Sequence, residues 1–367
     1  MKKNSKAFAV VMAGGKGERF WPQSRLSSPK QLLRLLGNLT LIEQTIERLY
    51  PVFCKENIFV VTNGIYVEPM RKLIPSLPSA NIIGESSRKD TAPCIAATVA
   101  YIKSLTQEED PVLCFLPADH VINDTASFAE VLSDCLDMAD DTGSIVTVGI
   151  TPDQPQTGFG YIETGSAITA PGSTKFHKVL QFKEKPDIET ARKYLEAGNY
   201  KWNSGIFFAK SSTWIKEFTK SAGELALFIQ KAVPVLKKES WNSPDFEALF
   251  NSLDPISIDY AVMEHADNVV TAQATFDWDD VGSWTSLRNQ LEPDEDKNVI
   301  RGLHKGIGTK NCIIVGDSEK LIATVDVEDM VIVNTEDSLL VCSAKSAQKV
   351  KELVGILEKD PALNKFV

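Results

Sequence analysis

The sequence predicts an α/β protein in which a mainly parallel sheet domain is followed by a small β-domain with a terminal helix. Two observations support this fold class. Short apolar runs alternate with helical patterns in the first half of the chain, and closely spaced β-runs follow an acidic segment near residue 292. With 367 residues, 43% of them hydrophobic, the chain is long enough for one large core and a smaller second one.

The first half of the chain is expected to form strands separated by helices. The expected strands are Ala7–Met12, Ile58–Thr62, Asn81–Ile83, Val112–Leu116 and Ser144–Val148. The expected helices are Thr40–Leu49, Tyr66–Leu73, Ala92–Leu105 and Ser127–Met138. This alternation predicts a buried, Rossmann-like parallel sheet with helices on both faces, whose ligands bind beyond the carboxyl ends of the strands. The loops after Met12 and Leu116 are therefore the first candidate sites.

From about residue 155 to 290 the pattern becomes irregular. The expected strands are Phe159–Glu163, His177–Glu184, Ile206–Ala209 and Val269–Phe276, and helices are expected at Ile188–Leu195 and Leu225–Lys237. We interpret this part as an elaboration of the same domain, which then covers residues 1–291.

The last part of the chain, residues 298–367, is predicted to be a small, β-helix-like domain with a terminal helix. The acidic segment 292–297 suits a linker. Short β-runs follow at Cys312–Val315, Leu321–Val325, Met330–Val333 and Leu339–Val341, before a helical pattern at Ala344–Leu357. The few strands form too weak a repeat to fix a coil type.

Composition excludes several classes of protein. The net charge of −10 argues against nonspecific nucleic-acid binding. The six cysteines show no C-x-x-C spacing, which disfavours a zinc site or a disulfide framework and favours a reducing cytoplasm. No apolar stretch is long enough to span a bilayer, so we expect no membrane partner.

The segment 1–34 is strongly basic on an otherwise acidic chain, with eight Lys and Arg against one acid. Within it, the expected strand ends in Gly14-Gly15-Lys16-Gly17, where backbone N–H groups can approach phosphate oxygens without interference from Cβ atoms. The cations in this stretch are Lys16, Arg19, Arg25 and Lys30. The glycines alone would equally fit a tight strand–helix turn. Together with four cations they predict a site for a small anionic ligand.

Two other phosphate-binding patterns do not fit this loop. A dinucleotide-binding turn requires a third glycine and an acid after the second strand, and Pro22 suits a loop better than the helix of that motif. A P-loop would end in Lys followed by Ser or Thr, and this loop does not. An NAD-type oxidoreductase is therefore disfavoured, and absence of a nicotinamide-dependent absorbance change would dispose of it.

The sequence pattern G-G-x-G-x-R-x-x-P…P-K over residues 14–30 resembles the signature of the sugar-1-phosphate nucleotidyltransferases. Gly17-Glu-Arg-Phe-Trp-Pro-Gln-Ser-Arg25 is similar to the branch formed by the GDP-mannose pyrophosphorylases, or mannose-1-phosphate guanylyltransferases. Further matches follow in family order: Asp90-Thr-Ala-Pro93, Leu116-Pro-Ala-Asp-His120, Thr157–Glu163, Phe182–Pro186, Trp202-Asn-Ser-Gly205, Ser257–Glu264 and Trp278–Trp284. The resemblance covers nearly the whole chain.

The resemblance implies transfer of GMP from GTP to α-D-mannose 1-phosphate, which gives GDP-mannose and pyrophosphate. It implies that the loop of Gly14, Gly15, Lys16 and Gly17 holds the triphosphate. Arg19 and Lys30 would be the catalytic cations that stabilise charge on the leaving group. No protein nucleophile is needed, because the attacking phosphate is already ionised.

By the same resemblance, Asp119 and Asp280 are the ligands of Mg²⁺, an ion that prefers carboxylates, phosphate oxygens and water. Asp119 follows a predicted buried strand, which places it at the ligand edge of the sheet. It could instead cap the start of a helix. Asp277 and Asp279 are alternatives to Asp280.

The remaining site residues are assigned to the sugar phosphate and to the base. Gly160, Glu184, Lys185 and Asn203 match family positions for the sugar phosphate, where Glu184 can accept sugar hydroxyls and Lys185 can bind the phosphate. Asp259 either orients the sugar or caps a helix.

Glu85 is the candidate for the guanine N1–H and N2–H groups. It is joined in nucleotide binding by Asp90, Thr91 and Pro93. Ser86 and Asp90 differ from the residues that the family usually has at these positions, which leaves the detailed base contacts open.

Two alternatives remain besides the oxidoreductase. One is another sugar-1-phosphate nucleotidyltransferase, which would use glucose 1-phosphate with UTP or dTTP, and the other is a noncatalytic nucleotide-binding or regulatory protein. Asp119→Ala should abolish turnover if catalysis is metal-assisted and should leave it intact if Asp119 only caps a helix. Some families fuse this activity to a phosphomannose isomerase domain. The chain ends at Val367, soon after the β-domain, so we expect no isomerase activity. The β-domain is a candidate contact in a homodimer, although the sequence does not give the oligomeric state.

Overall fold

The computed structural model describes residues 4, 6–317 and 319–367, which form two compact units. The first, here called the sheet unit, contains Met1–Gly14, Ile46–Ala118 and Ile122–Trp278. The second unit contains Gly15–Thr45, Asp119–Val121 and Asp279–Val367. This division differs from the one expected along the sequence, because residues 15–45, 119–121 and 279–291 lie in the same unit as the C-terminal β-domain.

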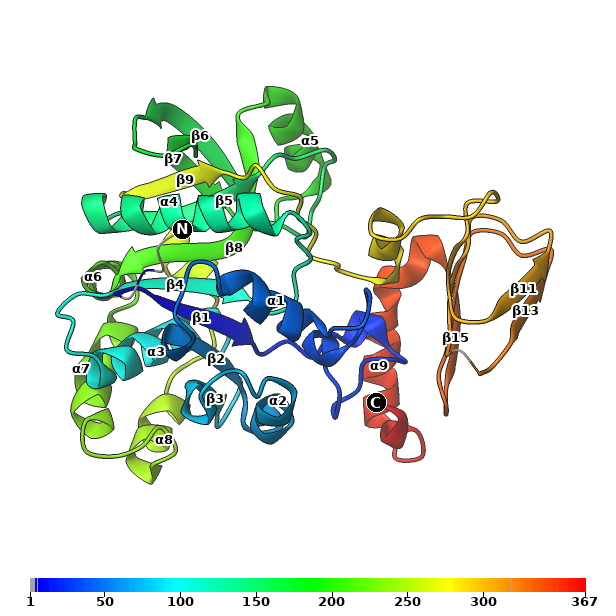
Figure 1. Ribbon diagram of the computed structural model, residues 1–367, viewed down its shortest axis with the longest axis horizontal. Coiled ribbons are helices and arrows are strands. Elements are labelled where there is room, and N and C mark those ends of the chain that lie inside the picture. The colour runs from blue at the N-terminus through cyan, green and yellow to red at the C-terminus, as the bar shows by residue number, and fades with distance from the viewer. Residues whose placement is uncertain (1–3, 5, 318) are drawn as a thin grey trace. The chain divides into compact units, whose positions relative to one another are not determined.

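Nine strands form the sheet of the sheet unit, in the order β3-β2-β1-β4-β8-β5-β9-β7-β6 (Figure 1). The first four are β1 (Phe8–Ala13), β2 (Ile58–Asn63), β3 (Ile82–Glu85) and β4 (Val112–Pro117), and they run parallel. In their register Met12 lies beside Pro117, and Asn63 lies beside Glu85. The carboxyl ends of β1 and β4, where the sequence placed its first candidate sites, therefore lie at the same edge of the sheet, and Glu85 at the end of β3 lies at that edge as well.

The other half of the sheet is mixed. It contains β5 (Ile145–Ile150), β6 (Tyr161–Ile168), β7 (Phe176–Lys183), β8 (Tyr200–Lys210) and β9 (Val269–Gln273). Strand β8 is antiparallel to both β4 and β5, whereas β9 is parallel to β5. The α/β fold class is confirmed. The sequence missed the first half of β8, because Asn203-Ser204-Gly205 lacks the apolar alternation of a strand.

The helices of the sheet unit agree with the prediction except for two that the sequence did not reveal. The observed helices, the first of which begins in the second unit, are α1 (Leu41–Leu49), α2 (Val67–Leu73), α3 (Thr91–Leu105), α4 (Thr125–Thr142), α5 (Ile188–Ala197), α6 (Ser211–Ser221), α7 (Gly223–Leu236) and α8 (Pro244–Asn251). Helices α6 and α8 were missed. Helix α6 opens with Ser, Thr and Trp, which are weak helix formers, and α8 is short.

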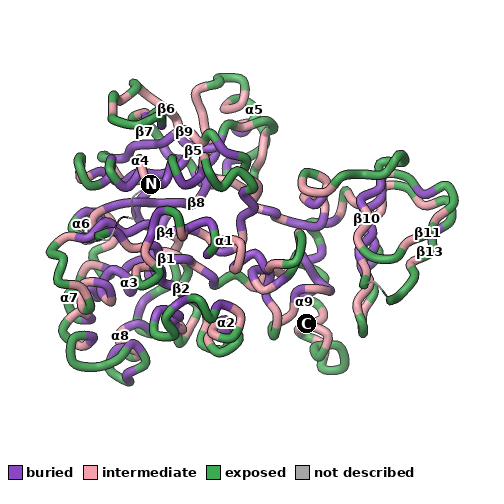
Figure 2. The backbone as a smooth tube through the Cα atoms, in the orientation of Figure 1, coloured by how far each residue is buried: buried purple, intermediate pink, exposed green. Residues whose placement is uncertain are grey.

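One apolar core joins a face of the sheet to α3, α6, α7 and α8. Every second strand residue contributes to it, for example Val10, Phe59 and Phe115, as expected when successive side chains of a strand point to opposite faces. Figure 2 shows these strands buried along most of their length. Such two-sided burial fixes the carboxyl edge as a rigid platform for the loops that follow.

The C-terminal β-domain lies within the second unit and has the β-helix-like form that the sequence predicted. Strands β10 (Val299–Arg301), β12 (Ile313–Val315) and β14 (Met330–Asn334) stack in parallel, β11 (His304–Ile307) pairs with β13 (Ile322–Val325), and β15 (Leu339–Ser343) closes the larger sheet. Helix α9 (Val350–Lys359) follows a short 3-10 turn, so the terminal helix begins later than predicted.

The signature segment packs onto this domain rather than standing apart from it. Phe20 and Trp21 share one apolar core with Trp284, with Val331 and with Val354 of α9. The ring of Phe20 meets that of Trp284 edge-on at 5.1 Å between centroids. The β-domain therefore supports the glycine-rich loop directly.

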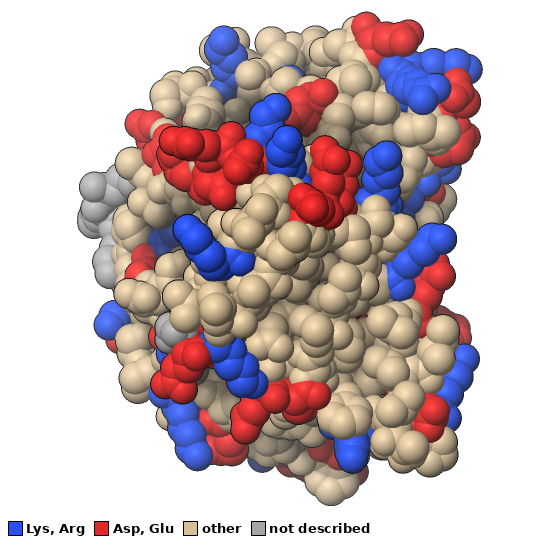
Figure 3. Space-filling model, turned by 90° about the vertical axis from the view of Figure 1, so that its right-hand side faces the viewer, with Lys and Arg blue, Asp and Glu red and all other residues tan. Residues whose placement is uncertain are grey.

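The surface of the β-domain exposes several large apolar side chains, namely Leu303, Ile307, Leu321, Val325, Leu339 and Val341. The face shown in Figure 3 has a broad area without charged side chains, bordered by residues of both signs. Among the helices in the described ranges, none is long and apolar enough to cross a membrane.

Candidate active site

The glycine-rich loop of the second unit is built against Lys30. Gly17 has a φ of +69°, in the left-handed region that favours glycine. A Cβ atom at this position would collide with Cβ of Lys30 and would lie 2.8 Å from its backbone nitrogen. Only a glycine lets the loop pass this close, so Gly17 and Lys30 hold each other in place.

Lys30 is the centre of this cluster and is only 6% exposed. Its Nζ lies 2.8 Å from Oδ2 of Asp119 and donates to the backbone carbonyl of Asp280 at 2.6 Å. A short antiparallel bridge between Val121 and Asp279 holds the two acidic segments side by side. The structure thus brings together Lys30, Asp119 and Asp280, as predicted from segments far apart in the sequence.

The charges in this cluster are strongly coupled. Burial acts to raise the pKa of Asp119, but the charges of Lys30 and His120 and the hydrogen bonds to the carboxylate together lower it by more, so the pKa lies below its ordinary value. The pKa of Asp280 is raised to about 6 by burial, with Asp279 and Asp119 adding to the shift and Lys30 opposing it. Two carboxylates in mutual repulsion are a suitable place for a cation.

The donor set fits an ion that takes the rest of its ligands from substrate and water. Within the described ranges, no group of three or more His, Cys, Asp or Glu side chains could hold a metal. Mg²⁺ is bound in this way by one or two carboxylates together with phosphate oxygens. Asp119 and Asp280 are therefore suited to a magnesium ion that arrives with a nucleotide.

The helix-cap alternative for Asp119 is wrong. Helix α4 begins at Thr125, and its cap is Asp124, whose Oδ1 accepts the backbone N–H of Ser127 at 3.0 Å. Asp119 lies outside this helix start, and its carboxylate is bonded to Lys30.

The two alternatives to Asp280 have structural roles. Asp277 accepts hydrogen bonds from the backbone and the amide of Asn123 and from the backbone of Asp124, at 2.7 to 3.0 Å. Asp279 accepts the backbone N–H of Val281 at 2.7 Å and two side-chain amides. These bonds hold the loops together, so Asp280 is the favoured ligand among the three aspartates.

The other cations of the signature have different environments. Arg19 is exposed and lies near enough to Asp280 to lower the pKa of that carboxyl group. Arg25 contacts the C-terminal part of the chain, because it pairs with Asp337 at 2.6 Å and donates to the carbonyl of Phe366. Arg25 thus supports the fold, whereas the sequence had placed it among the ligand-binding charges. Lys16 pairs with Glu358, a contact that the sequence did not suggest.

A second cluster lies in the sheet unit and contains all five residues expected to bind the sugar phosphate. The amide Nδ2 of Asn203 donates to Oδ1 of Asp259 at 3.1 Å, and the backbone N–H of Asn203 donates to the carbonyl of Gly160 at 2.8 Å. A Cβ atom on Gly160 would lie 2.6 Å from Oε2 of Glu184. Lys185 Nζ donates to Oε1 of Glu184 at 2.5 Å.

Asp259 is directed at this cluster and is not a cap. Asp259 is the first residue of a short helix, Asp259–Met263, whose cap position is Ile258, and the hydroxyl of Ser257 accepts the backbone N–H of Tyr260. Burial raises the pKa of Asp259 to about 7, with nearby Glu184 acting in the same direction and Lys185 opposing it. The buried Glu184 and the half-buried Asp259 beside one lysine form a hydrogen-bonding site of the kind that sugar hydroxyls require.

Two residues that the sequence analysis did not assign support this cluster. The hydroxyl of the buried Thr147 donates to Oδ1 of Asn203 at 3.0 Å, which orients the amide nitrogen toward Asp259. Glu264 accepts the backbone N–H of Glu184 at 3.1 Å. Glu264 stands in the Ser257–Glu264 motif, but nothing in the spacing indicates which backbone group it would meet.

Glu85 is the last residue of β3 and is 9% exposed. Its Oε1 finds no hydrogen-bond partner among the described residues. Burial raises its pKa to about 7, while a hydrogen bond with Cys94 and the charge of Arg88 act against the shift. A buried acceptor without a donor is costly, so this oxygen is suited to a ligand N–H group.

The residues that follow Glu85 in the predicted nucleotide set have structural contacts of their own. Asp90 caps α3 by accepting the backbone N–H of Thr91 at 2.7 Å. The Thr91 hydroxyl accepts the backbone N–H of Ile258 at 2.8 Å, and Pro93 is buried in the first turn of α3. Their direct contact with a nucleotide stays a prediction.

Comparison with known proteins gives matches along most of the chain. Residues 8–297 match the nucleotidyl transferase family, and residues 302–357 match the MannoseP isomerase/GMP-like beta-helix domain. The mannose-1-phosphate guanylyltransferase of Klebsiella pneumoniae is 37% identical over 358 residues, covering 96% of this chain and 74% of that protein. The mannose-1-phosphate guanylyltransferase of Escherichia coli K12 is 36% identical over 360 residues, covering 97% and 74%.

A crystal structure of mannose-1-phosphate geranyltransferase from Thermus thermophilus matches with a TM-score of 0.84 and 31% identity, covering 96% of this chain and 99% of that one. The similarity in sequence and in structure therefore extends over both the sheet and the β-domain. The chain belongs to the nucleotidyl transferase family, in its mannose-1-phosphate guanylyltransferase branch.

Proposed function

We propose that this protein transfers GMP from GTP to α-D-mannose 1-phosphate and so forms GDP-mannose and pyrophosphate. The observation that carries the proposal is the contact of one buried lysine, Lys30, with both Asp119 and the Asp280 backbone beside a glycine-rich loop. In a member of this family, such a cluster suits a metal-bound triphosphate better than any uncharged ligand.

The chemistry requires positioning and charge neutralisation more than covalent catalysis. The mannose phosphate oxygen would attack the α-phosphorus in line, and pyrophosphate would leave. The backbone N–H groups of Gly14, Gly15 and Gly17 are proposed to bind phosphate oxygens together with Lys16. Arg19 and Lys30 would stabilise the negative charge that grows on the departing pyrophosphate.

Mg²⁺ is the proposed cofactor, with Asp119 and Asp280 as its protein ligands. When bound, it would neutralise charge on the triphosphate oxygens. Lys30 contacts the Asp119 carboxylate and holds the backbone of Asp280 beside it. We propose that this lysine serves both the metal ligands and the leaving group.

The cluster in the sheet unit is proposed to bind mannose 1-phosphate. Glu184 and Asp259 would accept sugar hydroxyls, the Asn203 amide would add a hydrogen bond, and Lys185 would bind the phosphate as a point charge. Gly160 keeps space for the Glu184 carboxylate, because any side chain at that position would displace it.

Glu85 is proposed to recognise guanine through the N1–H and N2–H groups, which requires the carboxylate form. Because the pKa of free Glu85 is about 7, the fraction able to bind falls as the pH drops below that value. GTP should therefore bind about tenfold more weakly at about pH 6 than at about pH 8. Equilibrium titration with GTP across this range measures the effect.

The control for this pH effect is Glu85→Gln. It should bind GTP weakly and with a flatter pH profile, because the residual titration then comes only from the triphosphate and from other groups such as Asp280, whose pKa is about 6. The wild type and Glu85→Gln should differ less in their affinity for inosine triphosphate, which lacks the N2 amino group, than in their affinity for GTP. If the pH profiles of the wild type and Glu85→Gln were parallel, the proposed role of Glu85 in base recognition would be wrong.

The function itself is tested by a screen of pyrophosphate release. GTP with mannose 1-phosphate and Mg²⁺ should be the fastest pair, by about 10²-fold or more over glucose 1-phosphate with UTP or dTTP. Faster turnover of glucose 1-phosphate would point to the other branch of the family. Cytoplasmic location and a homodimer formed through the β-domain both stay predictions, the second tested by light scattering.

A further inference from the structure

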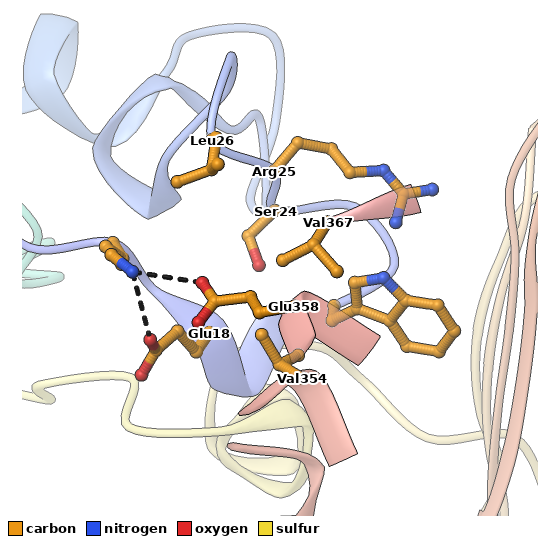
Figure 4. Close-up of a pocket in the computed structure, with 9 residues that line it drawn as sticks. Glu18, Ser24, Arg25, Leu26, Val354, Glu358 and Val367 are labelled. Carbon is orange, nitrogen blue, oxygen red and sulfur yellow. Dashed lines mark hydrogen bonds and ion pairs between the residues drawn. The ribbon is translucent and has the colours of Figure 1, made fainter. Parts of the chain in front are cut away.

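The phosphate-loop lysine is already paired with carboxylates of its own unit. Lys16 Nζ lies 3.0 Å from Oε1 of Glu358 on α9 and 3.8 Å from Oε1 of Glu18. The dashed lines in Figure 4 join these groups. Lys16 and Glu358 are 37% and 33% exposed, so solvent and an incoming anion can reach the pair.

Glu358 is held over the loop by several other contacts of the C-terminal segment. Trp21 Nε1 donates to the carbonyl of Phe366 at 2.7 Å, and Lys351 Nζ lies 3.8 Å from Glu18. Val354, one turn before Glu358, is buried against the core that contains Trp21. The carboxylate is therefore placed beside the loop by a packed helix and not by a mobile tail.

Glu358 and an incoming triphosphate compete for the ammonium group of Lys16, because both are anions. An ammonium group that is 3.0 Å from a carboxylate is partly neutralised and is less available to a second anion. A triphosphate that contacts Lys16 must replace the bond to Glu358 at least in part. Replacement leaves Glu358 without its cation. The free energy of the Lys16–Glu358 ion pair is then lost, and this loss weakens the binding of the triphosphate.

We propose that Glu358 is a positioning residue that sets the affinity of the loop for the triphosphate by holding Lys16 until the nucleotide replaces it. This inference rests on the proposed role of Lys16 in binding GTP. It gives the C-terminal helix a part in the reaction through its contact with the loop. Glu358 itself acts only through Lys16.

The test compares Glu358→Gln with Glu352→Gln, a matched change at an exposed position of the same helix. Glu358→Gln should bind GTP about two- to fivefold more tightly, which is the range that one partly exposed ion pair can supply. The kcat at saturating substrates should stay close to that of the wild type. The gain should shrink as salt is added, because salt screens the pair.

The outcome that overturns the inference is a Glu358→Gln protein that binds GTP as Glu352→Gln does, or more weakly. Lys16→Gln separates this failure from a failure of the proposed function. If Lys16→Gln weakens GTP binding while Glu358→Gln changes nothing, only the inference is wrong. If Lys16→Gln has no effect, the loop does not use Lys16 and its proposed role is lost as well. In the Lys16→Gln protein, adding Glu358→Gln should not change the affinity for GTP.

Discussion

Lys30→Met should lower kcat/KM for pyrophosphate release by about 10³-fold or more. Lys30 is 6% exposed and contacts Asp119 and the Asp280 backbone at once. Its loss would remove a cation from the leaving group and would also free the Asp119 carboxylate. Because two roles are lost together, the effect should exceed that of removing a single hydrogen-bond donor.

Steady-state pyrophosphate release, corrected for the folded fraction by circular dichroism, measures this loss. Lys30→Arg keeps the charge and should recover part of the activity, although the planar guanidinium cannot copy a point charge in this narrow space. Arg34→Gln, an exposed change in the same segment, should remain close to the wild type. A Lys30→Met protein within tenfold of the wild type would contradict the proposed role.

The parallel half of the sheet was predictable because its strands are continuous apolar runs and its connections carry helical patterns. The ends of β1 and β4 could therefore be placed at one edge from the sequence. The first half of β8 was not, since polar Asn203 and Ser204 lie in a strand that carries site residues. Local propensity fails there because the site requires residues that a strand would not otherwise select.

The resemblance named the residues of both clusters, but it could not show what holds them. The role of Lys30 in orienting Asp119, and that of Thr147 in orienting Asn203, depend on contacts between distant segments. Glu358 carries no sequence signal at all, because a glutamate on a surface helix is ordinary. The grouping of the loop with the β-domain is likewise a matter of packing, through Phe20 and Trp284.

Asp280→Asn and Asp277→Asn should have opposite signatures, although the two residues are close in sequence. Asp280→Asn should lower kcat/KM by about 10²- to 10³-fold and weaken Mn²⁺ binding to the protein–GTP complex by at least about tenfold. Its melting midpoint in EDTA should be unchanged or higher, because a half-buried carboxylate near Asp119 and Asp279 is removed. Electron paramagnetic resonance of Mn²⁺ gives a measure of the ligand role that does not depend on turnover.

Asp277→Asn should instead cost about 1 kcal/mol of stability and leave turnover of the folded protein largely intact. Its carboxylate accepts the backbone N–H groups of Asn123 and Asp124, and an amide offers a weaker acceptor to the same donors. Thermal melts and Mn²⁺ titrations on both proteins distinguish a metal ligand from a loop support. If Asp277→Asn abolished Mn²⁺ binding while Asp280→Asn left it unchanged, the ligand pair would be Asp119 and Asp277, and Lys30 would orient only one of them.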